Sequence, residues 1–183
     1  MHPAFLYLPG EKLSHSELSA ARIDGHVVEV GEGYIPADLL EGPDVRATAV
    51  AAFVRTGTAA CGPTAAWIHG AGDAPPSVHH VRRCVERRLR PATSARLVFH
   101  DTMVPASDVA LIGGVPVTSP IRTMLDLATT LHRDARVLPW MNALAAALPE
   151  TPAGAAAALR ELHRVPGSRA GLAALGRLVV RTR

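Results

Sequence analysis

The chain has 183 residues, of which 48% are hydrophobic and 4% aromatic, and its net charge is +3. This apolar content excludes a globally disordered chain and suffices for one domain, or for a small module and a larger domain. No segment approaches the ~20 consecutive apolar residues of a transmembrane helix, and residues 1–10 lack the basic and apolar segments of a signal peptide. We therefore expect a cytoplasmic protein with no membrane partner.

Charge is unevenly distributed along the chain. Residues 1–48 hold eight acidic and three basic residues, a net charge of −5. Residues 77–100 and residues 160–183 each hold six arginines and one glutamate, a net charge of +5. Such polarity is typical of a protein with an acidic partner, either nucleic acid or an acidic protein surface. The alternative is that the acidic and basic segments neutralise each other within the fold.

The first predicted elements are a short helix and a β-hairpin. Ser14 can cap a helix over residues 13–22, and Glu17 completes a capping box. Residues 26–35 are predicted as a hairpin around Gly31-Glu32-Gly33. A capped helix followed by a hairpin is typical of the second half of a winged helix-turn-helix, in which the helix reads DNA and the hairpin is the wing.

Residues 1–44 are accordingly interpreted as a winged-helix-like module, abbreviated because too little chain precedes the helix for the usual first helices. The module places Arg22 among the candidate DNA contacts, although its acidic residues oppose an approach to phosphates. The alternative interpretation is a helix–hairpin cap packed on the main domain. Residues 36–43, with two prolines and a glycine, have the composition of a linker.

Residues 45–183 are predicted as a mixed α/β domain with a small sheet and a helical C-terminal half, so the whole chain is of the α+β class. Residues 45–56 are expected to form a helix that Gly57 ends. A second helix over residues 63–68 carries Trp67 as a core anchor. His69 at its end is expected at the surface, because no acid or nucleophile lies at a recognisable spacing from it.

A basic hairpin is predicted in the middle of the chain. Residues 78–85 and 95–100 read as two strands joined by the turn Arg87-Arg88-Leu89-Arg90-Pro91. An exposed arginine turn is the strongest nucleic-acid signal in the chain, and the absence of interleaved aromatic residues favours phosphate contact over base stacking. The candidate nucleic-acid-binding residues are Arg82, Arg83, Arg87, Arg88, Arg90 and Arg96 of this hairpin and Arg22 of the N-terminal module.

The stretch G-G-V-P-V-T-S-P-I-R-T-M-L-D-L, residues 113–127, joins the predicted sheet to the C-terminal helices. The two glycines supply a turn after a strand at 109–112, and Pro116 confines the next strand to an edge or an end of the sheet. Arg122 and Asp126 are four residues apart on the following helix and can form an ion pair, which is worth ~0.5 kcal/mol or less if it is exposed. Further helices are predicted at about 136–148, 154–163 and 167–180, followed by a basic tail over residues 177–183.

No catalytic or cofactor-binding pattern is present in the sequence. It has no phosphate-binding loop of the Walker type and no G-x-S-x-G elbow. Cys61 and Cys84 give neither a disulfide framework nor a metal signature, and the adjacent His79 and His80 lack a third ligand. We therefore expect a non-enzymatic protein without a cofactor or a metal.

Several motifs in this order resemble the AbiEi-type antitoxins and transcriptional regulators of actinobacteria. These motifs are A-T-A-V and C-G-P-T-A-A-W-I-H-G within residues 46–70, a Pro-Pro strand, the arginine-rich hairpin, and x-V-T-S-P-x-R-T-x-x-D-L within residues 113–127. The resemblance covers residues 13–131. It implies an N-terminal winged helix that binds operator DNA, a C-terminal α/β domain that neutralises a nucleotidyltransferase toxin, and membership of a type IV toxin–antitoxin system. Some members carry an additional endonuclease-like domain, and this chain stops before any such domain.

Two functions follow as hypotheses. The first is a non-enzymatic transcriptional regulator of antitoxin type that contacts operator DNA phosphates through its arginine-rich surfaces. The alternative is a protein-binding antitoxin or adaptor that neutralises a partner nucleotidyltransferase without binding DNA.

Overall fold

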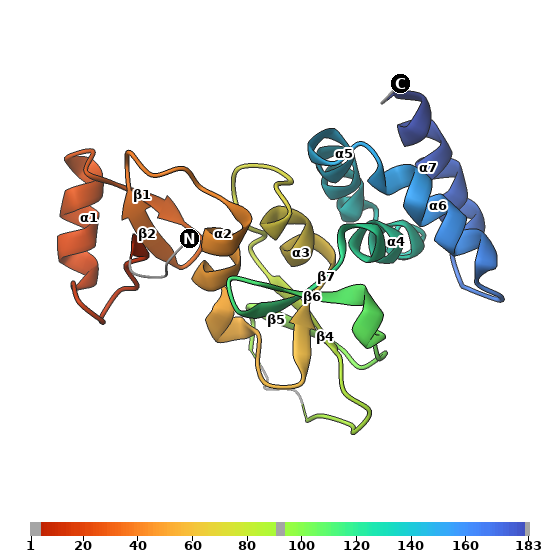
Figure 1. The fold of residues 1–183 in the computed structure, drawn as a ribbon, viewed down its shortest axis with the longest axis horizontal. Helices are drawn as coiled ribbons and strands as arrows, with labels where there is room; N and C mark the ends of the chain where they lie inside the picture. Colours follow the sequence, from red (N-terminus) through yellow and green to blue (C-terminus); the bar gives the residue numbers. More distant parts are fainter. Residues whose placement is uncertain (1–4, 91–93, 182–183) are drawn as a thin grey trace.

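The computed structural model of the chain describes residues 5–90 and 94–181. This part of the chain forms a two-stranded sheet, a five-stranded mixed sheet and a helical C-terminal half, which confirms the predicted α+β class. The N-terminal helix and hairpin lie at one end of the molecule, the five-stranded sheet in the middle and the last helices at the other end (Figure 1). Pro91 of the predicted basic turn and the last two residues of the basic tail lie outside the described residues.

The N-terminal helix and hairpin form where the sequence predicts them. Helix α1 (His15–Ile23) is followed by the antiparallel strands β1 (Val27–Val30) and β2 (Gly33–Pro36). The predicted capping box is present, because Ser14 Oγ accepts from the backbone N–H of Glu17 and the Glu17 carboxylate accepts from the backbone N–H of Ser14.

The tip of this hairpin packs against the main domain. Val30 and Ile35 are buried in one core with residues of α2 (Pro43–Ala49) and α3 (Gly62–Ile68). Gly31 has a φ of +59°, and a Cβ atom there would lie 3.1 Å from Ala49 Cβ. Because the tip is enclosed in this way, it is not free to enter a DNA groove.

The main sheet has the strand order β5-β4-β3-β7-β6. Pairing is antiparallel between β3 and β4 and between β6 and β7, and parallel between β3 and β7 and between β4 and β5. The strands are β3 (Thr58–Ala60), β4 (His79–Arg83), β5 (Leu97–His100), β6 (Val109–Ile112) and β7 (Val115–Thr118). Strand β7 lies inside the sheet, but it pairs with β3 through Val117 alone, so Pro116 stands at the end of that pairing as expected for a residue without an N–H.

The predicted basic hairpin is wrong in its pairing. Strands β4 and β5 form as expected, but they run parallel, with His79 opposite Leu97 and Val81 opposite Phe99. A parallel pair needs a connection of about a dozen residues that returns to the starting end, and residues 84–96 provide it. The arginine-rich segment is therefore a crossover along the sheet, and the two strand ends do not meet at an arginine tip.

Four helices form the C-terminal half and bury a second core. They are α4 (Pro120–Thr130), α5 (Leu138–Ala147), α6 (Thr151–Glu161) and α7 (Ser168–Arg181). Their small alanine-rich faces let them pack closely around Met124, Met141, Leu144 and Leu175, all fully buried. The helix predicted over residues 45–56 is shorter, because α2 ends at Ala49 and a 3₁₀ turn, η2 (Ala51–Phe53), follows it. Such 3₁₀ turns are common at helix ends.

Candidate nucleic-acid interface

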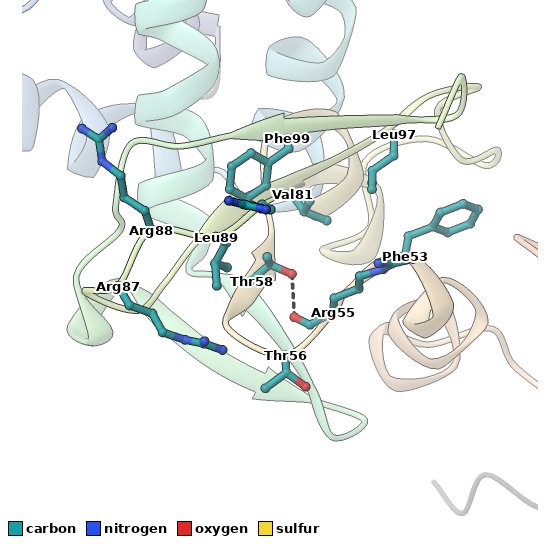
Figure 2. A pocket seen from close by; sticks show the side chains of 11 residues that line it. Phe53, Arg55, Thr56, Thr58, Val81, Arg87, Arg88, Leu89, Leu97 and Phe99 are labelled. Carbon is teal, nitrogen blue, oxygen red and sulfur yellow. Dashed lines mark hydrogen bonds between the residues drawn. The ribbon is translucent and has the colours of Figure 1, made fainter. Parts of the chain in front are cut away.

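A hollow of ≈ 380 Å³ opens on the β3–β4–β5 end of the sheet. Side chains alternate between the two faces of a sheet, so Val81 and Phe99 share the face that carries the hollow, whereas Arg82 points to the opposite face. The lining residues come from η2, the turn before β3, the crossover and the strands β3, β4 and β5 (Figure 2). They are Phe53, Arg55, Thr56, Thr58, Val81, Arg87, Arg88, Leu89, Arg90, Leu97 and Phe99.

Gly57 lets the crossover lie close to the start of β3. Its φ is +85°, and a Cβ atom there would lie 3.1 Å from Val85 Cγ2 and 3.3 Å from Leu89 Cδ1. The backbone N–H of Cys84 donates to the carbonyl of Gly57 over 2.9 Å. Glycine is suited to both the positive φ and the close approach, and the result is a fixed wall for the hollow.

Arg83 holds the beginning of the crossover in place. Its Nη1 donates to the carbonyls of Val85 and Glu86 over 2.8 and 2.7 Å, and its Nε donates to the carbonyl and the carboxylate of Asp101 over 2.9 and 3.1 Å. The rigid guanidinium fork can satisfy several acceptors at once. Arg83 thus positions the segment that carries the next arginines.

Four arginines around the hollow are exposed. Among the described residues, Arg55, Arg87, Arg88 and Arg90 take part in no ion pair. Figure 2 shows Arg87 and Arg88 on the crossover, with their guanidinium groups pointing in different directions. Guanidinium groups bind phosphate or carboxylate oxygens in a bidentate manner, so these four arginines can hold an anion.

The other arginines of the predicted set lie elsewhere. Arg82 forms an ion pair with Asp126 at 3.3 Å on the opposite face of the sheet. Arg96 pairs with Glu32 of the N-terminal hairpin and lies over the Phe53 ring at 5.3 Å. The hydrogen bond from Arg96 is the main reason why the pKa of the Glu32 carboxyl is lowered. Arg22 is exposed on α1, at the end of the molecule away from the hollow (Figure 1).

The structure therefore divides the candidate arginines into two groups. Arg87, Arg88 and Arg90 surround the hollow, while Arg82, Arg83 and Arg96 are engaged within the fold. Arg55 also lines the hollow. The sequence did not predict it as a contact, because it lies in a turn outside the arginine-rich segment. Only the packing of that turn beside the crossover brings it to the site.

The predicted Arg122–Asp126 ion pair forms, and it is largely buried, so the small free energy of an exposed pair does not apply to it. Asp126 Oδ1 receives Arg122 Nε at 3.0 Å and faces Arg82 Nη1 at 3.3 Å, and the Asp126 side chain is only 7% exposed. Arg122 also donates to Asp108 over 3.0 Å. Burial raises the pKa of Asp126, and the two arginines oppose that shift. This network joins β4, the turn before β6 and α4.

His69 at the end of α3 and the sheet histidines His80 and His100 are partly buried. His69 was expected at the surface, but its Nε2 lies 2.7 Å from the Thr118 carbonyl oxygen, and burial lowers its pKa. His80 Nδ1 lies 3.1 Å from His100 Nε2, and the two rings stack. Burial lowers the pKa of His80 and brings that of His100 to about 4.

These histidines predict a loss of stability in mild acid. The unfolded chain protonates His100 below about pH 6.5 and the folded chain only near pH 4. Unfolding therefore takes up a proton between these values, and stability falls as the pH is lowered through them. We expect His100→Gln to reduce this fall by about 2 kcal/mol in urea unfolding between pH 7 and pH 4. His163→Gln, at an exposed position, is the control. An unchanged pH dependence in His100→Gln would contradict the assignment.

The described residues contain no group of three or more His, Cys, Asp or Glu residues that could hold a metal ion. Burial raises the pKa of the Cys61 thiol to about 12, so the thiol stays protonated and is a poor nucleophile. No helix within residues 5–90 and 94–181 has the length and hydropathy to cross a membrane.

Comparisons with known proteins identify the class. A family profile described as the AbiEi antitoxin C-terminal domain matches residues 58–179, from β3 almost to the end of α7. The chain belongs to the AbiEi antitoxin family, which confirms the resemblance seen in its motifs. Members of this family are generally non-enzymatic, and an antitoxin family implies a cognate toxin partner.

The crystal structure of the RV2827C protein from Mycobacterium tuberculosis matches with a TM-score of 0.45 and 17% sequence identity, and the match covers 91% of this chain and 69% of that chain. A search of curated proteins found no match.

Proposed function

We propose that this antitoxin-family protein is a transcriptional regulator that binds DNA phosphates through the arginine rim, defined as Arg55, Arg87, Arg88 and Arg90. The observation that carries the proposal is the gathering of four exposed guanidinium groups around one hollow, whose described lining residues include no acid. Like charges held together repel one another, and an anionic partner relieves that repulsion. A phosphate backbone is such a partner.

Other predicted contacts take different roles in this proposal. Arg83 positions the crossover, and Arg82 and Arg96 hold the sheet to α4 and to the N-terminal hairpin. Residues 1–44 are proposed as a separate module whose exposed helix α1, with Arg22, is the second DNA contact. The hairpin tip is packed against α2 and α3, so the proposal gives it no role as a wing.

Binding of duplex DNA at several salt concentrations tests the proposal. The probe is a labelled duplex from the region upstream of the protein's own gene. We expect Arg87→Ala/Arg88→Ala/Arg90→Ala to weaken binding about 100-fold at low salt, because arginine–phosphate contacts release counterions. The slope of log K against log [salt] should fall in magnitude by about 0.9 for each phosphate that the variant no longer neutralises.

A charge-matched variant controls for overall electrostatic attraction. Arg160, Arg169 and Arg177 are exposed residues of the C-terminal helices, and their replacement by alanine removes the same charge. An equal loss of affinity in both triple variants would contradict a site at the rim, and so would an unchanged salt slope in the rim variant.

The second candidate is a protein-binding antitoxin, and family membership is the observation that favours it. If this candidate is right, we expect the protein to co-purify stably with a nucleotidyltransferase encoded next to its gene. We also expect no shift of the duplex at any salt concentration. Those two results together would replace the DNA-binding proposal.

A further inference from the structure

The floor of the hollow is apolar, although its rim is cationic. Val81 is almost fully buried there, and Phe53, Leu89, Leu97 and Phe99 are half-buried around it. Contacts with a duplex backbone need only the exposed arginines, so they give the floor no role. Apolar surface that stays open beside several unpaired cationic side chains is typical of a ligand site.

We propose that the hollow binds an unpaired nucleotide, with the base against the apolar floor and the phosphate on the arginine rim. The inference rests on the proposed function, because it assigns the same arginines to phosphate. The nucleotide has two possible sources, a free nucleotide or an unpaired residue of a DNA strand, and both present the same chemistry to the site.

Shape and size fit this ligand. A volume of ≈ 380 Å³ lies within the range of about 300–1,000 Å³ that small-molecule sites have. Paired bases within a duplex show only their edges, whereas an unpaired base can lay its face on an aromatic or apolar surface. The hollow is therefore suited to a single base and its phosphate.

Two phenyl rings distinguish this site from a simple phosphate-binding surface. The Phe53 ring stacks on the His79 ring with centroids 4.3 Å apart, and the Arg96 guanidinium carbon lies 5.3 Å from its centroid, so both contacts fix the ring at the edge of the hollow. Phe99 stands on β5 opposite Val81 and lines the hollow near the crossover (Figure 2). Neither ring lies between Arg87 and Arg90 in the sequence, which is why that segment shows no interleaved aromatic residues.

The electrostatics select an anion with a flat apolar part. Of the lining residues within the described part of the chain, none is acidic. The Thr58 hydroxyl donates its one hydrogen to the Arg55 carbonyl over 2.7 Å, so it cannot also donate to a base. Recognition thus depends on stacking and on phosphate contact, and it is tolerant of base identity.

Fluorescence anisotropy with a labelled oligo(dT) 12-mer and a mixed-sequence duplex of equal length tests the inference. We expect Phe99→Leu, which keeps an apolar side chain but loses the ring, to weaken oligo(dT) binding about 10-fold and to leave duplex binding unchanged. Phe99→Tyr should retain the wild-type affinity because it restores the ring. Val98→Leu, on the opposite face of β5, is the matched control, and thermal unfolding confirms that each variant is folded.

Competition separates the sources of the nucleotide. Displacement of oligo(dT) by millimolar dTMP supports a free-nucleotide site, and displacement only by unlabelled oligo(dT) supports a site for a strand. Displacement by polyglutamate as effective as that by oligo(dT) would overturn the inference in favour of an acidic peptide.

The two proposals fail in different ways. In the first case, duplex binding depends on Arg87, Arg88 and Arg90, but Phe99→Leu binds oligo(dT) as tightly as the wild type. That result overturns the nucleotide site and leaves the regulator function intact. Oligo(dT) binding that depends on Phe99, without any duplex binding, overturns the regulator function and supports the nucleotide site.

Discussion

Asp126→Asn is expected to lower the free energy of unfolding by about 3–5 kcal/mol. Asp126 Oδ1 faces guanidinium nitrogens of both Arg122 and Arg82, and these arginine side chains are only 16% and 13% exposed. Removing the carboxylate charge leaves two partly buried cations, of which Arg122 keeps its ion pair with Asp108. Breaking a buried ion pair from one side costs far more than breaking an exposed one.

Urea unfolding at pH 7 measures this effect. The control is Asp134→Asn, since Asp134 pairs with Arg136 in an exposed local contact, and we expect little change there. A second variant, Arg82→Met/Asp126→Leu, replaces one charge pair by apolar side chains and should recover part of the loss of stability. A loss below about 1 kcal/mol in Asp126→Asn would show that the network behaves like a surface pair.

Arg83→Ala is expected to lower both stability and duplex affinity, although Arg83 contacts no DNA in the proposed complex. The change removes hydrogen bonds to the carbonyls of Val85 and Glu86 and to Asp101. Hydrogen bonds to a charged group contribute about 1.5–3 kcal/mol, so we expect the free energy of unfolding to fall by about 2–3 kcal/mol. The freed crossover would then hold Arg87 and Arg88 less firmly.

Duplex affinity and its salt dependence distinguish positioning from contact. We expect Arg83→Ala to weaken duplex binding about 10-fold with an unchanged salt slope, because the same phosphates are still neutralised by the rim. Arg83→Lys should lie between wild type and Arg83→Ala, since an ammonium group cannot reproduce the planar fork. A slope reduced by about 1 in Arg83→Ala would instead identify Arg83 as a direct phosphate contact.

The elements that sequence predicted well depend on interactions within a few residues. The Ser14–Glu17 capping box and the Gly113-Gly114 turn between β6 and β7 are both local. The order of motifs around A-A-W-I-H-G and x-V-T-S-P likewise led to the correct family. Each of these features is set by neighbouring residues whatever the rest of the chain does.

The elements that sequence mispredicted depend on distant partners. Alternation predicted strands β4 and β5, but their parallel direction follows from the path of residues 84–96. The spacing of Arg122 and Asp126 predicted their pairing, but it did not predict the burial of Asp126 or its second ion pair with Arg82 of β4. Two residues four apart on a helix have the same spacing whether they face solvent or pack against a sheet. Spacing alone therefore cannot distinguish an exposed pair from a buried one.

The fold class, the first helix cap, the turns, the family and the basic character of residues 77–100 could all be predicted from local sequence patterns. Tertiary structure decided which arginines remain exposed and which aromatic residues accompany them. The reason is physical: a net charge is a sum over residues, whereas a binding site depends on which charges find partners. Asp126, Asp101 and Glu32 engage three of the six arginines, and the other three surround an apolar hollow with Arg55.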